Sequence, residues 1–296
     1  LLAVTFTNKA AREMKERLEL LLAQKLAQSQ FGQPWSTLPA VEQRQLRSRI
    51  YREVIKELWI GTFHALFARL LRFDIDKFKD PEGLSWTRQF SIYDENDVQS
   101  LIKEIVTQEL QLDPKRFEPK KVRWAISNAK NQGWMPEQLE ADAGGQRGRL
   151  MAETYRRYRR ALAANNALDF DDLLLLPVQL LRQNEQIRDY WHRRFRHVLV
   201  DEYQDTNRTQ YDLIKLLVTN GRDPAAYDDW NGRSVFVVGD ADQSIYSFRA
   251  ADFTILMGFQ DDFGDGAPGD VTSTMVKLEE NYRSTATILE AANALI

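Results

Sequence analysis

Three short apolar runs stand out along the chain, at residues 1–6, 198–200 and 235–238. Each is followed by polar or glycine-containing sequence. Continuous apolar runs of this length are typical of parallel strands buried on both faces, whereas half-exposed strands alternate apolar and polar residues. Long stretches with helical periodicity separate the runs. The pattern therefore predicts an α/β fold with a parallel sheet and crossover helices.

In such sheets, ligands bind beyond the C-terminal ends of the strands. Polar residues follow all three predicted strands at this point, at residues 5–8, 201–205 and 239–243. Because parallel strands end at the same edge of the sheet, we expect these segments to lie close together and to carry the chemistry of the protein.

The first two runs lie much further apart in the chain than one crossover helix requires. Helical patterns fill the interval, and turn signals separate them. We therefore expect residues 94–170 to form an inserted all-α subdomain, which splits the sheet domain into residues 1–93 and 171–280. Residues 28–39 and 220–233 are expected to be surface insertions.

The composition excludes several kinds of site and of protein. The chain has no cysteine, which excludes disulfides, thiolate metal sites and a cysteine nucleophile. No histidines stand in a zinc-binding spacing. No apolar run approaches the roughly 20 residues of a membrane-spanning helix, and no leader pattern is present. We expect a cytoplasmic protein without a membrane segment.

The net charge of −3 does not indicate nucleic-acid binding, which usually requires a basic surface. The basic residues nevertheless gather in two clusters. For both, a solvated helix face is the favoured interpretation from charge alone. The clusters are Arg156, Arg157, Arg159 and Arg160, and His192, Arg193, Arg194 and Arg196.

Two adjacent carboxylates, Asp201 and Glu202, follow the second apolar run. At a strand end the first can hold a magnesium ion and the second can activate a water molecule. Acidic residues are also common at solvated strand ends, and that interpretation is favoured for an isolated pair. The next residues change this judgement.

Residues 201–207 read Asp-Glu-Tyr-Gln-Asp-Thr-Asn, which resembles the Walker B motif of the UvrD/Rep/PcrA-type helicases of superfamily 1. Five more segments resemble motifs of this family and stand in the family's order. They are residues 3–11 (motif Ia), 61–64 (motif Ib), 168–173 (the segment closing the inserted subdomain), 238–246 (motif III) and 278–284 (motif IV). The six blocks extend over nearly the whole chain.

The resemblance implies an ATP-driven motor with two RecA-like domains that moves on single-stranded DNA. This chain would be an incomplete RecA-like P-loop NTPase domain with its helical insertion, and residues 281–296 would begin the second motor domain. A P-loop of the form Gly-x-x-x-x-Gly-Lys-Ser/Thr occurs nowhere in the chain. In the family it precedes motif Ia, so we expect it before Leu1 and expect the chain alone to be inactive.

For the nucleotide, the resemblance implies ATP with Mg²⁺. Asp201, with Glu202 beside it, would bind the metal, and Glu202 would activate the hydrolytic water. Gln243 would sense the γ-phosphate. Tyr282 would stack on adenine and Arg283 would reach the γ-phosphate, since the guanidinium donors match phosphate oxygens.

For DNA, the resemblance implies a single-strand path lined by residues from motifs Ia and Ib: Phe6, Thr7, Asn8, Thr62, Phe63 and His64. His64 considered alone is more typical of a structural hydrogen-bonding residue. In motif III, Tyr246 and Phe248 would stack on bases, and Arg249 would meet a phosphate beside them. This chain has Phe248 where the family often has Trp, and Ala250 where it usually has Gly.

The leading hypothesis is a fragment of an ATP-dependent 3′-to-5′ DNA helicase acting on single strands and single-strand/duplex junctions, in repair or replication restart. A nuclease-fused relative of the RecB/AddA type is one alternative. Another is a catalytically inactive homologue that serves as a DNA-binding module. The presence of Asp201, Glu202, Gln243 and Arg283 together argues against inactivity.

Overall fold

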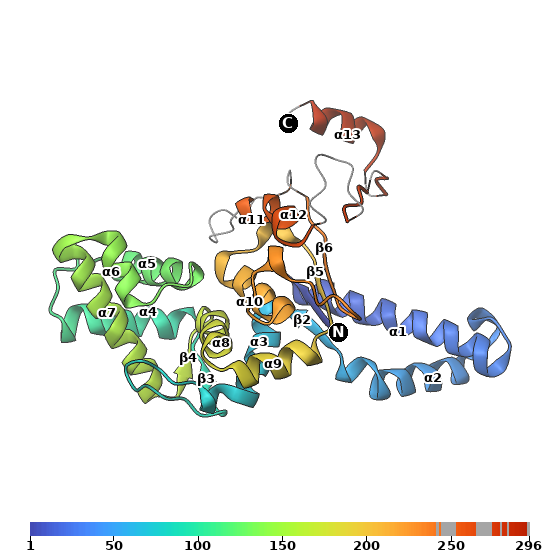
Figure 1. The fold of residues 1–296 in the computed structure, drawn as a ribbon, viewed down its shortest axis with the longest axis horizontal. Coiled ribbons are helices and arrows are strands. Elements are labelled where there is room, and N and C mark those ends of the chain that lie inside the picture. Colours follow the sequence, from blue (N-terminus) through green and yellow to red (C-terminus); the bar gives the residue numbers. More distant parts are fainter. Residues whose placement is uncertain (241–242, 244–252, 265–273, 279, 283, 295–296) are drawn as a thin grey trace.

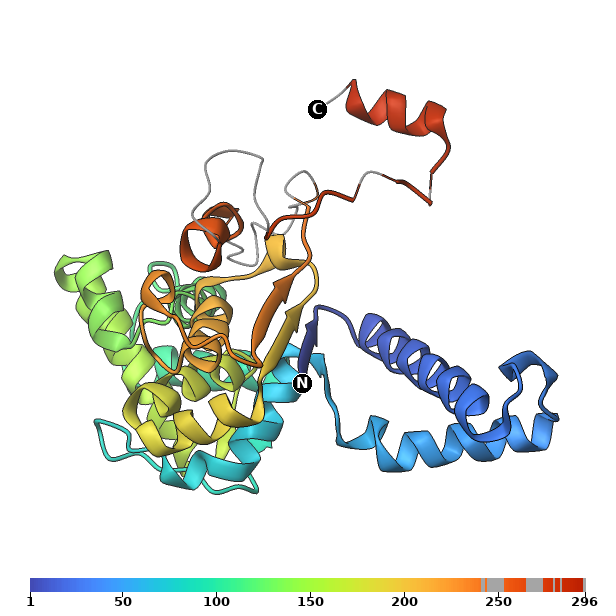
Figure 2. The same cartoon turned by 45° about the vertical axis from the view of Figure 1, so that its right-hand side comes forward.

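A computed structural model describes residues 1–240, 243, 253–264, 274–278, 280–282 and 284–294. A small parallel sheet stands at the centre, with a group of helices on one side and a two-helix hairpin on the other (Figure 1). Helix α13 (Ala286–Asn293) lies apart from the sheet in both views (Figures 1 and 2). The predicted α/β fold with a parallel sheet is confirmed.

The sheet has four parallel strands in the order β2-β1-β5-β6. Their bounds are β1 Leu2–Thr5, β2 Trp59–Thr62, β5 His197–Val200 and β6 Ser234–Val237. Val4 of β1 lies opposite Gly61 of β2 and Val200 of β5, so β1 occupies the middle of the sheet.

Two predictions about the sheet were wrong. Strand β2 was missed, because it has only four residues and includes a glycine, which weakens the strand pattern. Strand β6 was expected to be buried on both faces, yet Phe236 is 57% exposed. Strand β6 lies at the edge of the described sheet, where β5 is its neighbour on one side.

Helices α1 (Asn8–Phe31) and α2 (Ala40–Glu53) form a hairpin that projects from the sheet (Figure 2). The Thr7 hydroxyl caps α1 by accepting from the backbone N of Ala10, and the helix ends at Gly32 in the left-handed region. The hairpin has its own small core, which includes Ala23 and Ile50. The predicted insertion 28–39 forms its tip, with α1 continuing to Phe31.

Helices α3 (Phe63–Asp74), α8 (Asp172–Gln183), α9 (Glu185–Arg194) and α10 (Arg208–Thr219) cover the sheet. Their apolar faces and the strands form one large core. Two short helices, α11 (Phe253–Met257) and α12 (Phe259–Phe263), pack beside it. Among the described helices, none has the length and apolar content needed to span a membrane.

The helices between residues 95 and 164, on the side of the sheet away from the α1–α2 hairpin, have a separate core. They are α4 (Glu95–Glu104), a π-helical turn (Ile105–Glu109), α5 (Pro119–Asn131), α6 (Pro136–Ala143) and α7 (Gly145–Ala164). A short parallel pair, β3 (Ser91–Ile92) with β4 (Ala167–Leu168), joins the two ends of this segment. The domain boundaries expected near residues 94 and 170 stay predictions.

The first basic cluster lies on α7 and is paired within the protein. Arg159 is buried, which the solvated-face interpretation did not anticipate, and it bonds to Asp80. The other three arginines also form ion pairs; the partners are Glu137 and Glu140 for Arg156, Glu109 and Glu153 for Arg157, and Glu82 for Arg160. These arginines therefore join α7 to α6, to the π-helical turn and to the loop at Asp80 and Glu82.

Candidate functional site

Asp201 and Glu202 stand directly after β5, at the carboxyl edge of the sheet. The backbone N of Asp201 donates to the carbonyl of Val4 at 3.0 Å, which fixes this strand end beside β1. Asp201 is half-buried, whereas Glu202 is exposed. Glu202 has φ +51°, a conformation uncommon for non-glycine residues, and such strain often occurs at functional sites.

The Gln204 side chain, only 1% exposed, joins two of the strand-end loops. Its Nε2 donates to Glu202 Oε2 at 2.8 Å, and its Oε1 accepts from the backbone N of Asp240 at 3.1 Å. A Cβ at Gly239 would come within 2.9 Å of that oxygen, so a larger residue there would displace the Gln204 side chain. Gln204 was not predicted as a functional residue, because a buried amide in a loop leaves no local signal in the sequence.

Gln243 lies just beyond β6, the neighbour of β5, where its Nε2 donates to Asp240 Oδ2 at 2.7 Å. The structure therefore brings Gln243 to the same sheet edge as Asp201. Tyr282 is 89% exposed, and its hydroxyl contacts Glu280. The structure shows no packing of Tyr282 against the strand-end carboxylates in the described part of the chain. Arg283 lies outside the described residues, as do Tyr246, Phe248 and Arg249.

The two strand-end carboxylates fit a magnesium ion in their donor chemistry. Mg²⁺ prefers oxygen ligands and is usually held by one or two carboxylates together with waters and phosphate oxygens. Burial, and after it the charge of Glu202, raises the pKa of Asp201. Both causes disfavour the ionised form of Asp201, and a bound cation would favour that form.

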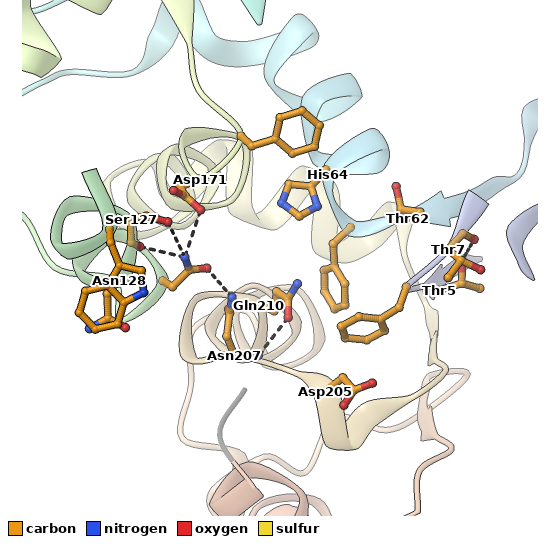
Figure 3. A pocket seen from close by; sticks show the side chains of 15 residues that line it. Thr5, Thr7, Thr62, His64, Ser127, Asn128, Asp171, Asp205, Asn207 and Gln210 are labelled. Carbon is orange, nitrogen blue, oxygen red and sulfur yellow. Dashed lines mark hydrogen bonds between the residues drawn. The ribbon is translucent and has the colours of Figure 1, made fainter. Parts of the chain in front are cut away.

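A pocket of about 540 Å³ opens beside this edge (Figure 3). Five of the six residues predicted from motifs Ia and Ib line it, namely Phe6, Thr7, Thr62, Phe63 and His64. The sixth, Asn8, is exposed and is not part of the lining; it begins α1. These residues come from the ends of β1 and β2, which are neighbours in the sheet.

Aromatic rings and helix ends define the chemistry of this pocket. Phe6 and Phe63 meet edge to face, with ring centroids 5.7 Å apart. The Thr7 and Thr62 hydroxyls cap α1 and α3, so the N-termini of these two helices lie at the pocket. Free backbone N–H groups at helix N-termini attract anions such as phosphates. The pocket therefore combines surfaces for flat rings with sites for phosphate groups.

Residues of the helical segment complete the pocket and were not predicted as site residues. Trp124 on α5 is 65% exposed, and Phe170 is 56% exposed and lies against the His64 ring at 5.1 Å. The sequence did contain a signal for Trp124, because this tryptophan stands off the apolar face of an amphipathic helical pattern. The remaining polar lining residues of the helical segment and of the chain around α10 are Ser127, Asn128, Asn131, Asp171, Asp205, Asn207 and Gln210.

Comparison with known proteins agrees with this geometry. A family model described as the UvrD/REP helicase N-terminal domain matches residues 1–264. The chain is 38% identical over 296 residues to the ATP-dependent DNA helicase PcrA of Bacillus subtilis (strain 168), covering 100% of this chain and 33% of that protein. PcrA of Staphylococcus aureus (strain NCTC 8325 / PS 47) is 37% identical over 295 residues, with the same coverage. The chain thus spans about a third of the length of the curated relatives it matches.

Proposed function

The chain belongs to the UvrD/REP helicase N-terminal domain family, and from that premise we propose that it forms the ATP-hydrolysing and strand-gripping part of a 3′-to-5′ DNA helicase. One observation carries the proposal. The strand-end carboxylates and the aromatic pocket lie at the same edge of one sheet, on the adjacent strands β5, β1 and β2. The substrates would be single-stranded DNA and single-strand/duplex junctions, with ATP and Mg²⁺ as cofactors.

In this proposal the two strand-end carboxylates have different roles at the nucleotide. Asp201 would hold Mg²⁺, which when bound neutralises charge on the phosphate oxygens. Glu202 would orient the attacking water and accept its proton as the bond to the γ-phosphate breaks. The bond from Gln204 would keep the Glu202 carboxylate in one position. Gln243 would respond to loss of the γ-phosphate, and Tyr282 and Arg283 would contact the nucleotide from the far side.

At the DNA, the rings of Phe6 and Phe63 would contact bases without sequence preference, because every base presents a flat face. The N-termini of α1 and α3 would receive the phosphates. Asn8 and His64 would add polar contacts, and Tyr246, Phe248 and Arg249 would extend the path. Since β1 lies between β2 and β5, one strand would connect the DNA contacts to the nucleotide site.

The test uses the full-length protein that carries this chain. We expect single-stranded DNA to stimulate its ATPase activity, and Glu202→Gln to abolish turnover while ATP binding persists. Glu185→Gln, at an exposed position at the start of α9, is the matched control and should keep wild-type turnover. DNA binding without any hydrolysis by the wild-type protein would overturn the proposal and favour an inactive DNA-binding module. Because these 296 residues contain no P-loop sequence, we expect the isolated chain to hydrolyse ATP negligibly.

A further inference from the structure

A cluster of polar side chains joins the end of α5 to the start of α10, between the pocket and the strand-end loop (Figure 3). Asn207 Nδ2 donates to Asn131 Oδ1 at 2.6 Å, across 76 positions of sequence. Asn131 Nδ2 in turn donates to Asp171 Oδ1 at 3.0 Å. The Thr209 hydroxyl lies 2.8 Å from the Lys130 carbonyl and 3.0 Å from that of Asn131.

Asn207 contributes both to the pocket and to the N-terminal cap of α10. It lines the pocket together with Asn131 and Asp171. It also caps α10, because its Oδ1 accepts from the backbone N of Gln210 at 2.9 Å. Asn207 also follows Thr206, the residue that ends the short turn Tyr203–Asp205 containing Gln204. The Asn207 side chain therefore contacts the helical segment and caps α10, and its backbone continues from the loop that carries the strand-end carboxylates.

The burial of this cluster makes it stiff. Asn207 is 5% exposed and Thr209 is 1% exposed. The bond from the Thr209 hydroxyl to the Lys130 carbonyl is buried and cannot be replaced by one to water, so separating α5 from α10 would leave these polar groups unpaired. Through Thr206, α10 is continuous with the turn at Tyr203–Asp205, which includes Gln204 and its bond to Glu202.

We propose that Asn131 and Asn207 are positioning residues that couple a DNA strand in the pocket to the placement of Glu202. The inference rests on the proposed function and deepens it, since it names the connection by which strand binding would raise the rate of ATP hydrolysis. A strand that contacts Trp124 or Phe170 shifts α5 and the adjoining turn. The bond from Asn207 to Asn131 passes this shift to the loop after β5.

The decisive variant is Asn207→Asp. Its carboxylate still caps α10, but it no longer donates to Asn131. If the Asn131 amide rotated to donate to the new carboxylate at position 207, its oxygen would then face the Asp171 carboxylate, and the hydrogen bond to Asp171 would be lost. We expect the ratio of DNA-stimulated to DNA-free ATPase kcat to fall about tenfold, equivalent to about 1.4 kcal/mol of coupling. The DNA concentration for half-maximal stimulation should change less than about threefold.

The matched control is Asn184→Asp. Asn184 caps α9 in the same way, accepting from the backbone N of Ile187 at 3.1 Å, and among the described residues its side chain forms no hydrogen bond to another helix. This variant should keep the wild-type stimulation ratio. Both variants are compared by thermal unfolding, which separates a loss of coupling from a loss of fold.

A second pair of variants tests the same connection without altering the cap. Asn131→Asp keeps the acceptor for Asn207 but faces Asp171 with a second carboxylate, and should also lower the stimulation ratio. Adding Asp171→Asn restores a donor and acceptor between the two positions, and should bring the ratio back to within about threefold of wild type.

The outcomes separate this inference from the proposed function. If wild-type ATPase activity does not respond to DNA, the proposed function fails. If the wild-type enzyme responds but Asn207→Asp is stimulated equally, the coupling role is wrong. Should Asn207→Asp fail to fold, the comparison of Asn131→Asp with the double variant decides, and a double variant no better than the single one overturns the inference.

Discussion

Lys130 is a buried cation whose removal should cost the protein a large part of its stability. The residue is 1% exposed. Its Nζ lies 2.7 Å from Asp169 Oδ2 and 2.7 Å from Asp172 Oδ1, and 5.0 Å from the centre of the Tyr158 ring. The Tyr158 hydroxyl also donates to Asp169 at 2.7 Å. This cluster joins the helical segment to α8.

The pKa shifts show how the charges depend on one another. Burial alone would lower the pKa of Lys130, but Asp169 and Asp172 raise it. Burial would likewise raise the pKa of Asp169, yet Lys130 outweighs this and lowers it. For Asp172 the balance is different, since burial and the charge of Asp169 raise its pKa to about 7. One lysine therefore keeps two buried carboxyl groups in place.

We expect Lys130→Met to reduce the free energy of unfolding by about 3–5 kcal/mol at pH 8, because it leaves buried carboxylates without a cation. For a domain of this size, the melting temperature should fall by roughly 6–20 °C. The destabilisation should shrink toward pH 5, where protonation removes the uncompensated charge. Thermal and urea unfolding across this pH range measure both effects.

Two controls accompany this measurement. Lys121→Met, on the same helix, removes a lysine whose side chain is 78% exposed and should change stability by less than about 0.5 kcal/mol. Adding Asp169→Asn to Lys130→Met should recover part of the loss, because one buried charge is removed. A loss below about 1 kcal/mol for Lys130→Met, or one that does not depend on pH, would refute the reasoning.

Three further predictions concern the sites. Burial, and after it the charge of Asp169, raises the pKa of Asp171 from 3.8 to about 6. The stabilising contribution of Asp171 is therefore present below about pH 4 and is lost as the pH rises through 6. In Asp171→Asn the free energy of unfolding should vary less with pH over this window, and an unchanged pH profile would contradict this. Gly239→Ala should displace Gln204 and lower the ATPase kcat about tenfold with little change in ATP affinity, whereas wild-type kcat would show that the contact is unimportant. Phe6→Ala should weaken single-stranded DNA binding about tenfold in fluorescence anisotropy, and unchanged affinity would argue against base contact there.

The parts of the fold with a local signal could be predicted from the sequence. Strand β1 was identified because all four of its residues are buried, which produces a continuous apolar run. Strand β2 was missed because Gly61 interrupts its pattern, although the residues after it were assigned by their resemblance to motif Ib. The expectation that Phe6, Thr7, Thr62, Phe63 and His64 share one site came from their resemblance to motifs Ia and Ib, and the structure places all five at one pocket.

Contacts between distant segments could not be predicted in this way. The bond between Asn131 and Asn207 joins positions 76 apart, and each asparagine alone resembles an ordinary helix-end residue. The role of Gln204 depends on its neighbour Asp240, which becomes adjacent only when β5 and β6 pair. A pattern along the chain describes what each segment does locally, whereas these polar contacts depend on how the segments pack.

The hairpin of α1 and α2 offers a practical way to observe motion in this domain. At 24 residues, α1 is a rod of about 36 Å that starts at Asn8, directly beside the pocket. Because its core is separate from that of the sheet, a fluorophore near its tip at Gly32 would leave the sheet undisturbed. A rotation of about 10° at the base would move the tip by about 6 Å. The hairpin would therefore work as a lever arm that magnifies a small rearrangement at the sheet edge into a distance that energy transfer can measure.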